Sequence, residues 1–78
     1  MIKTMTAKLI AEGYEPKQYP WGTRWYKYEE DIDMGLNVDV YQTGEVVEWH
    51  ILSGPGALRV TDFEYNSVED WLNGKYAE

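Results

Sequence analysis

Apolar residues follow a helical period at the start of the chain. Ile2, Met5 and Leu9 recur at steps of three and four residues, and Ile10 widens the stripe. This spacing predicts a helix over Met1 to Glu12 that lays one apolar face on a core.

A glycine and two prolines mark the end of this helix. Gly13 suits the left-handed conformation that closes many helices, and Tyr14 is expected to fold back on Leu9. The segment from Glu15 to Gly22 then holds Pro16, Pro20 and two aromatic rings. We expect an irregular connector, and its two rings indicate that it packs on the domain and is not a free linker.

The middle of the chain has the composition and alternation of strands. Ring side chains and β-branched residues gather in short runs that are separated by turn residues. The predicted strands are Thr23 to Glu30, Leu36 to Tyr41, Val46 to Leu52 and Ala57 to Thr61, the last of which could continue to Tyr65. Asp31 to Gly35 and Ser53 to Gly56 are the predicted turns.

The second and third predicted strands form a hairpin around Gln42 to Glu45. A slip of one residue moves every side chain to the other face, so the apolar pattern selects the register. An even loop places the apolar residues together, with Val40 facing Val47, Val38 facing Trp49 and Leu36 facing Ile51. A three-residue loop would set Val38 against Glu48, so we expect a loop of two or four residues, with the longer one preferred.

A short helix is expected near the end of the chain. Asn66 or Ser67 caps it, and Asn66 with Glu69 resembles a capping box. Its apolar stripe consists of Val68, Trp71 and Leu72, Gly74 ends it, and the tail from Lys75 to Glu78 is expected to fray.

These elements predict an α+β fold. An N-terminal helix, an antiparallel meander of three to four strands and a short C-terminal helix follow in order, with both helices on one face of the sheet. The 78 residues, 44% of them hydrophobic and 15% aromatic, suffice for a single compact domain over residues 1–78 but leave no room for a large buried pocket.

Charge and composition narrow the classes of partner. The net charge of −7 disfavours direct binding to nucleic acid or to an anionic membrane and favours a protein with a basic surface. The chain has no cysteine, Met1 to Thr6 do not resemble a signal peptide, and no window is apolar enough to span a membrane. We therefore expect a cytoplasmic protein, in the host cytoplasm if a phage encodes it.

No residue set predicts catalysis. Asp39 and Glu48 face each other on the outer sheet face in the register above, but an open sheet face supplies no cleft for paired carboxylates. His50 is the only histidine, so a histidine-rich zinc site is excluded. Asp39 or Glu48 could orient it, yet the sequence offers no nucleophile to complete a triad, and a surface position with a pH-sensitive charge is the simpler interpretation.

Two loops bear a partial likeness to ligand-binding motifs. The run from Glu29 to Asp33, continued to Asp39, has the acidic spacing of a calcium loop. Leu36 and Gln42 occupy the positions at which an EF-hand needs glycine and glutamate. Ser53 to Gly56 lacks the lysine and the following helix of a phosphate loop. We expect neither a metal nor a cofactor.

The segment Arg24 to Tyr28 alternates basic and aromatic residues, as strands that bind single-stranded nucleic acid do. The order of helix, three strands and helix is also similar to that of the double-stranded RNA-binding domain. In that family the second helix begins with basic residues, where this chain has Glu69 and Asp70. The net charge therefore favours a structural role, in which the rings lie in the core and the two cations reach past them to solvent.

Protein binding is the expected function. The chain is similar in general character to phage-encoded inhibitors, including anti-CRISPR proteins, which are small, acidic and rich in aromatic residues. The hypothesis is a module that blocks a basic surface of a nucleic-acid-binding protein, at the extreme as a nucleic-acid mimic. The alternative is a non-catalytic accessory domain that self-associates, for instance as a homodimer.

The tryptophans and the acidic residues supply the candidate contacts. Trp49 and Trp71 belong to the core by periodicity, whereas Trp21 and Trp25 lie in or beside the irregular segment. The predicted acidic contacts are Glu29, Glu30, Asp31, Asp33, Asp39, Glu48, Glu69 and Asp70, and the predicted aromatic contacts are Tyr19 and Trp21.

Overall fold

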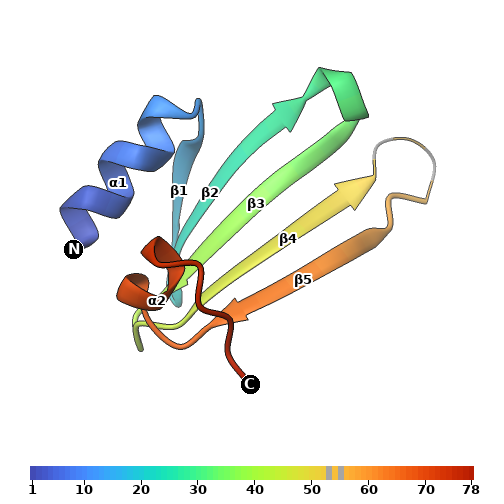
Figure 1. The fold of residues 1–78 in the computed structure, drawn as a ribbon. Coiled ribbons are helices and arrows are strands. Elements are labelled where there is room, and N and C mark those ends of the chain that lie inside the picture. Colours follow the sequence, from blue (N-terminus) through green and yellow to red (C-terminus); the bar gives the residue numbers. More distant parts are fainter. Residues whose placement is uncertain (53, 55) are drawn as a thin grey trace.

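Five antiparallel strands form one sheet in chain order (Figure 1). One helix precedes these strands in the sequence and another follows them. The computed structural model describes residues 1–52, 54 and 56–78, and for Thr61 the backbone alone. Ser53 and Pro55 of the predicted turn therefore lie outside the described residues. The elements are α1 (Ile2–Ala11), β1 (Glu15–Tyr19), β2 (Gly22–Glu29), the 3₁₀ turn η1 (Glu30–Ile32), β3 (Met34–Tyr41), β4 (Val46–Leu52), β5 (Arg59–Tyr65) and α2 (Val68–Leu72).

The first helix ends as its glycine predicts. Gly13 has a φ of 92°, and the backbone N–H groups of Gly13 and Tyr14 donate to the carbonyls of Ile10 and Leu9. These two bonds are those of a Schellman motif, which satisfies carbonyls that the helix leaves free. The predicted helix and its end are confirmed, and the motif sends the chain directly into β1.

The predicted connector is wrong, because Glu15–Tyr19 forms an edge strand. Pro16 lies opposite Trp25 and Lys17 opposite Arg24 in its pairing with β2. Proline lacks a backbone donor, so a strand that contains it can pair on one side only. The prolines are thus compatible with a strand at the edge of the sheet. With this strand the sheet has five strands, where three or four were predicted.

The register of the β3–β4 hairpin differs by one residue from the prediction. Val40 lies opposite Val46, and Val38 lies opposite Glu48. The Tyr41 N–H donates to the Glu45 carbonyl and the Gly44 N–H donates to the Tyr41 carbonyl, both at 2.9 Å, which closes a three-residue loop. Gly44 has a φ of 97° and supplies the left-handed residue that this loop requires. The predicted even loop is wrong. It assumed that the apolar residues of β3 and β4 gather on one face, whereas those of β4 divide between the two faces.

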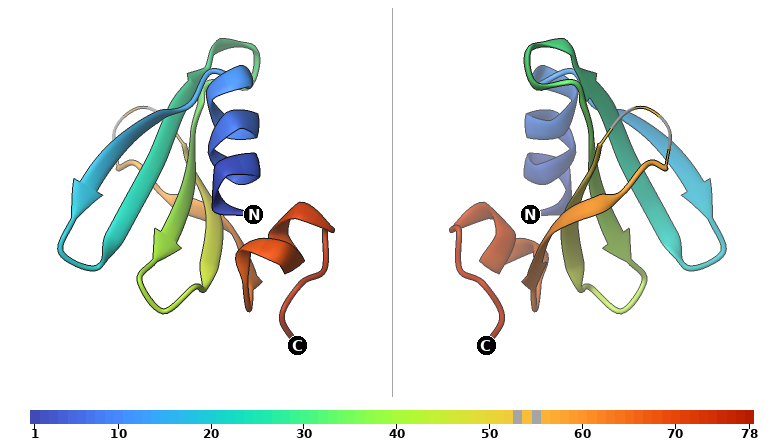
Figure 2. Two further views of the ribbon diagram at one scale, coloured as in Figure 1. Left: turned by 90° about the vertical axis from the view of Figure 1, so that its left-hand side faces the viewer. Right: turned by 90° about the vertical axis from the view of Figure 1, so that its right-hand side faces the viewer.

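Both helices lie on one side of the sheet, as predicted (Figures 1 and 2). The core between them and the sheet consists of seven buried residues from six elements: Met5, Leu9, Trp25, Val38, Val46, Tyr65 and Trp71. Trp25 and Trp71 anchor this core from the sheet and from α2 respectively. The prediction that Trp49 belongs with them is wrong, since the register places it on the opposite face.

The C-terminal helix is capped by Ser67, whose hydroxyl accepts from the Asp70 N–H at 3.0 Å. The tail that follows was predicted to fray, but the structure holds it in place. The Ala77 N–H donates to the Glu64 carbonyl of β5 at 2.7 Å, and the Tyr76 ring stacks on Phe63 with centroids 5.2 Å apart. The tail is thus held against the outer edge of β5.

Candidate binding surface on the open sheet face

The face of the sheet that points away from the helices carries large polar and aromatic side chains. Residues directly opposite each other on neighbouring strands share a face, so the register assigns its centre. Two rows cross the three central strands there and define what we call the open face: Arg24, Asp39 and Val47 in one row, and Tyr26, Asn37 and Trp49 in the next.

An ion pair lies at the middle of this face. The Arg24 Nε and Nη2 atoms donate to the two carboxylate oxygens of Asp39 at 2.8 and 3.0 Å. The Trp49 indole nitrogen donates to Asp39 Oδ2 at 2.9 Å. Asp39 is 2% exposed, and three hydrogen bonds offset the cost of burying its charge. The hydrogen bond to Asp39 also raises the pKa of Arg24 above its ordinary value.

Aromatic rings surround the guanidinium of Arg24. Its Cζ atom lies 5.4 Å from the centroid of Tyr19, 5.3 Å from that of Trp21 and 4.8 Å from that of Trp49, distances at which a cation is attracted to a ring face. Tyr19 and Trp21 stack with centroids 5.1 Å apart, and Tyr41 packs on Trp21 at 4.8 Å. Tyr19, Trp21 and Tyr41 together form what we call the aromatic cluster.

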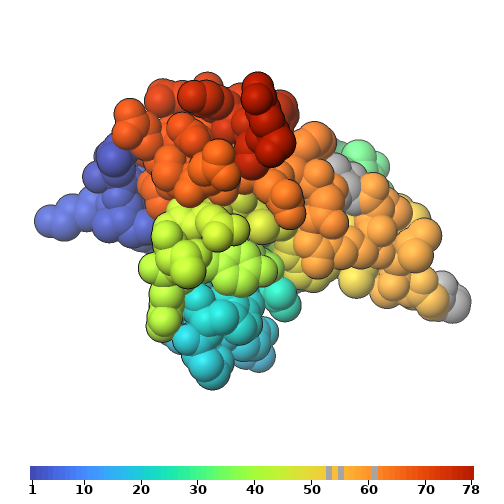
Figure 3. All heavy atoms as spheres, turned by 90° about the horizontal axis from the view of Figure 1, so that it is seen from below, coloured from blue at the N-terminus to red at the C-terminus, as the bar shows by residue number. Residues whose placement is uncertain are grey.

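The aromatic cluster is fixed by the turns that carry it. The Gln42 N–H donates to the Trp21 carbonyl at 2.9 Å, which joins the β1–β2 turn to the β3–β4 loop. Figure 3, viewed from below, shows these two turns side by side at one end of the molecule. The three rings are half-buried, so each presents part of its surface to solvent in a fixed orientation.

A second arginine continues the pattern toward β5. The Arg59 Cζ atom lies 4.5 Å from the Trp49 centroid, and Arg59 forms an exposed ion pair with Asp62 at 2.5 Å. Trp49 therefore contacts two guanidinium groups while its nitrogen is bound to Asp39. This environment explains how a tryptophan is accommodated on a face that no helix covers.

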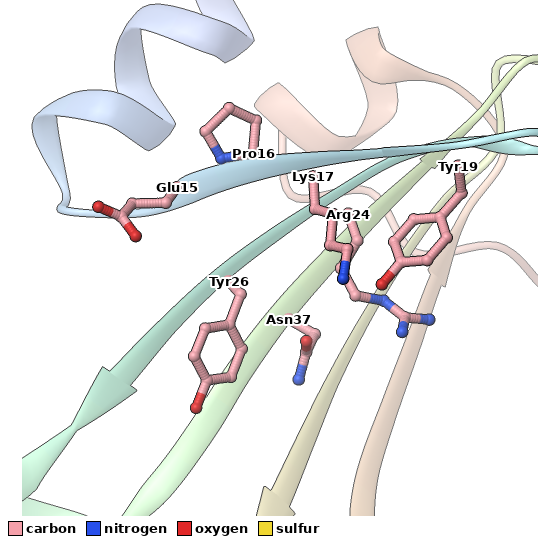
Figure 4. A pocket seen from close by; sticks show the side chains of 7 residues that line it. All are labelled: Glu15, Pro16, Lys17, Tyr19, Arg24, Tyr26 and Asn37. Carbon is pink, nitrogen blue, oxygen red and sulfur yellow. The ribbon is translucent and has the colours of Figure 1, made fainter.

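A cleft opens beside Arg24, between β1 and the centre of the open face (Figure 4). Its volume is about 480 Å³, and it is lined by Glu15, Pro16, Lys17, Tyr19, Arg24, Tyr26 and Asn37. Figure 4 shows Tyr26 and Asn37 pointing to the same side from adjacent strands, with Glu15 at one end of the cleft and Tyr19 at the other. Asn37 is 4% exposed, and within the part of the chain that the structure describes its amide nitrogen has no hydrogen-bond partner.

The predicted pairing of Asp39 with Glu48 is wrong. Glu48 lies opposite Val38 on the helix-covered face, where the Trp71 indole nitrogen donates to it, while Asp39 lies on the open face. The one-residue change of register separates them by the thickness of the sheet. Neither is an exposed carboxylate: Asp39 is buried and Glu48 is half-buried. Asp39 accepts from Arg24 and Trp49, and Glu48 accepts from Trp71.

The acidic run lies at the turn between β2 and β3. Glu30 and Asp31 are exposed in the 3₁₀ turn, whereas Glu29 is 3.8 Å from Lys27 and Asp33 accepts a hydrogen bond from the Tyr28 hydroxyl. Within the described residues no group of three or more potential ligands is placed to hold a metal ion.

The remaining predicted acids lie far from this turn. Glu69 is exposed and Asp70 is half-buried in α2, and Figures 1 and 2 show α2 and the β2–β3 turn at opposite ends of the molecule. The predicted acidic contacts therefore do not form one continuous surface. His50 lies on the helix-covered face opposite Leu36, so the sheet separates it from Asp39.

The structure brings together residues that sequence reasoning did not connect. Tyr19 and Trp21 were predicted as contacts, but Arg24, Asn37 and Trp49 were not. The missing signal was the pairing of β2 with β3, because opposite charges at Arg24 and Asp39 face each other when these strands are aligned by their short turn.

Comparisons with known proteins leave the surface to be interpreted from its own chemistry. No protein-family model, no curated protein and no solved structure matches this chain. Over the part of the chain that the structure describes, neither helix has the length and apolar character that crossing a bilayer requires.

Proposed function

We propose that the protein is a non-catalytic protein-binding module whose contact surface consists of the open face and the aromatic cluster beside it. The supporting observation is the guanidinium of Arg24, which is enclosed by Tyr19, Trp21 and Trp49 on a sheet face that no helix covers. Tyrosine, tryptophan and arginine are the residues that most often dominate the binding energy of protein interfaces.

The surface is ordered before any partner binds. Arg24 is held by the two hydrogen bonds that it donates to Asp39, and Trp21 packs on Tyr19 and Tyr41. Ordering a flexible side chain at an interface costs about 0.5–1.5 kcal/mol. Because these side chains already occupy fixed positions, binding at this face avoids most of that cost.

The charge of the molecule favours a partner with a basic surface. The net charge is −7, and Glu30 and Asp31 are exposed at one end. In this proposal these acids attract the partner and the open face holds it. Mimicry of nucleic acid is less well supported, since it requires a regular row of exposed acids, and here Asp39 is buried and Glu48 is bound to Trp71.

Self-association is the second candidate function, and the outer edge of β5 favours it. Leu58 is 62% exposed and Val60 is 42% exposed beside an edge that the tail covers at Glu64. Apolar side chains along an open strand edge favour pairing with another chain. A second copy that paired there would leave the open face accessible, so the two functions are separable by experiment.

Affinity capture with paired variants tests the proposal. Wild type, Trp21→Ala and Ile10→Ala are immobilised and exposed to a lysate of the encoding organism, and captured proteins are identified by mass. Ile10 is an exposed apolar residue of α1 and serves as the matched control. We expect a partner that wild type and Ile10→Ala retain and Trp21→Ala loses.

Two results would contradict this assignment. Retention of the same partner by Trp21→Ala, with its fold verified by circular dichroism, would remove the open face from the interaction. A solution mass twice that of the monomer, with no other protein captured, would favour self-association through β5.

A further inference from the structure

The cleft beside β1 contains a buried donor that no described residue satisfies. Among the described residues the Asn37 amide nitrogen has no partner, and the side chain, more than nine-tenths buried, lines the cleft. Leaving a buried N–H unpaired is unfavourable, and a native structure rarely retains one without reason. An acceptor that a ligand brings into the cleft would satisfy it.

Aromatic rings flank this donor. Tyr26 is 44% exposed, and its ring lies over Gly35, where an added methyl group would stand 2.9 Å from Tyr26 Cε1. Tyr19 lines the cleft with it, whereas the Pro16 ring lies on the helix side of β1, opposite Trp25 (Figure 4). Figure 4 shows the two tyrosines on either side of Asn37 and the arginine, so a ligand on Asn37 lies between two rings.

The charged groups of the cleft offset one another and leave no net charge to attract an anion. The guanidinium of Arg24 is already paired with Asp39, the Lys17 ammonium lies over the Tyr19 ring at 5.6 Å, and Glu15 contributes a carboxylate to the lining. The acceptor that fits Asn37 is therefore a neutral carbonyl, and Glu15 with the net charge of −7 favours cationic groups next to it.

We propose that this cleft binds a proline-rich peptide segment with flanking basic residues, in the polyproline II conformation. This inference rests on the proposed function and names the kind of segment that the open face recognises. A polyproline II chain has no internal hydrogen bonds, so its carbonyls are free to accept from Asn37, and its proline rings can pack on the exposed ring of Tyr26.

Addition of a β-strand at β1 is a poorer fit to the same cleft. Pro16 interrupts the backbone donors of β1, and lysine and proline on an edge strand both discourage pairing. The unpaired donor belongs instead to the Asn37 side chain on the sheet face. Aromatic-lined grooves that bind polyproline II segments also present side chains on a surface and not a strand edge.

Isothermal titration calorimetry with a defined peptide tests the inference. The probe is a synthetic peptide of about nine residues, three turns of polyproline II, with proline at most positions and an arginine at each end. The comparison peptide has glycine in place of each proline. We expect the proline peptide to bind wild type, and the glycine peptide to bind at least about ten-fold more weakly because it loses preorganisation.

The Asn37→Leu variant separates recognition from folding. It removes the unpaired donor, so we expect its thermal stability to equal or exceed that of wild type while its affinity for the proline peptide falls at least about ten-fold. Asn66→Leu makes the same change at an exposed position and should bind as wild type does. If Asn37→Leu does not fold, Tyr26→Ala, at a half-exposed ring, should show the same loss.

Three outcomes would overturn the inference: no binding of the proline peptide by wild type at about 1 mM, equal binding of the glycine peptide, or unchanged affinity in folded Asn37→Leu or Tyr26→Ala. Its failure is distinguishable from failure of the proposed function. If the peptide does not bind but a captured partner still depends on Trp21, the open face binds proteins through the aromatic cluster and not through this cleft.

Discussion

At the scale of single residues, the carboxylate of Asp39 organises the open face. It accepts hydrogen bonds from Arg24 and Trp49, and these two residues in turn contact the rings around them. Removing one member of a buried ion pair leaves the other charged group without compensation. The position of the guanidinium, and with it the shape of the binding surface, therefore depends on this one acid.

Asp39→Asn is expected to lower the free energy of unfolding by about 2–3 kcal/mol, somewhat less than for a fully buried pair because Arg24 retains some solvent contact. Asp62→Asn, which breaks the exposed pair with Arg59, is the control and should change stability by less than about 1 kcal/mol. Urea unfolding followed by circular dichroism measures both. Equal losses in the two variants would show that Asp39 is no more important than a surface acid.

The raised pKa of Tyr14 predicts that the stability of the protein falls at high pH. Burial, together with the nearby Glu48, Glu12 and Glu29, raises its pKa from 10.0 to about 12. The unfolded chain therefore loses this proton first, so the contribution to stability is complete below pH 10 and is lost as the pH rises toward 12.

Between about pH 9 and pH 12, wild type should lose about 1–2 kcal/mol more stability than Tyr14→Phe, whose ring cannot ionise. Urea unfolding at a series of pH values measures the difference between the two proteins, which cancels the titration of all other groups. Parallel curves across this range would contradict the assignment.

At the scale of elements, sequence periodicity located most of the structure. The bounds of β4 are those predicted, and α1 and β2 agree with prediction to within one residue at each end. These segments are recognisable because their own composition and caps define them. Glu15–Tyr19 was missed because a proline in a strand is a negative signal unless the strand is known to lie at an edge.

The loop of the β3–β4 hairpin decides what each face contains. The alternation along a strand divides its side chains into two sets, one for each face of the sheet. It does not say which of the two sets shares a face with the apolar residues of the neighbouring strand. Maximal apolar pairing selected the wrong register here, because Trp49 has an aromatic and ionic environment on the open face and Glu48 has a donor in Trp71. The candidate site could not be assembled from the sequence for the same reason.

Gly44→Ala is expected to destabilise the protein by about 1 kcal/mol, because it places a Cβ atom on a residue with a φ of 97°. Apart from Gly44 and its two chain neighbours, no heavy atom of the described residues lies within 4 Å of the added methyl group, so the cost arises from the backbone alone. Thr43→Ala in the same loop is the control and should have little effect. Thermal unfolding measures the stability of both variants. Equal destabilisation of the two would contradict the three-residue loop.

At the scale of the whole molecule, charge and aromatic surface occupy different places. Glu30 and Asp31 project from the β2–β3 turn at one end, and the aromatic cluster lies toward the other, beside the β1–β2 turn (Figures 1 and 3). Distant charges mainly accelerate association, whereas desolvated contacts determine how long a complex persists.

This separation predicts different kinetics for two variants with the partner that affinity capture identifies. Glu30→Lys with Asp31→Lys should slow association by about three- to ten-fold at low salt and have little effect at about 0.5 M salt. Trp21→Ala should instead accelerate dissociation by about ten-fold or more. Surface plasmon resonance at two salt concentrations separates the rates, and a charge-reversed variant that changes dissociation alone would place the acids inside the contact.

The division of tryptophans between the two faces has an optical consequence. Trp25 and Trp71 are buried between the sheet and the helices, whereas Trp21 and Trp49 lie among charged and aromatic groups on the open face. Emission from the first pair reports whether the core is intact, and emission from the second pair reports whether the open face is covered. The protein thus contains two intrinsic fluorescent reporters, and replacing either pair with phenylalanine isolates the signal of folding from the signal of binding in the same molecule.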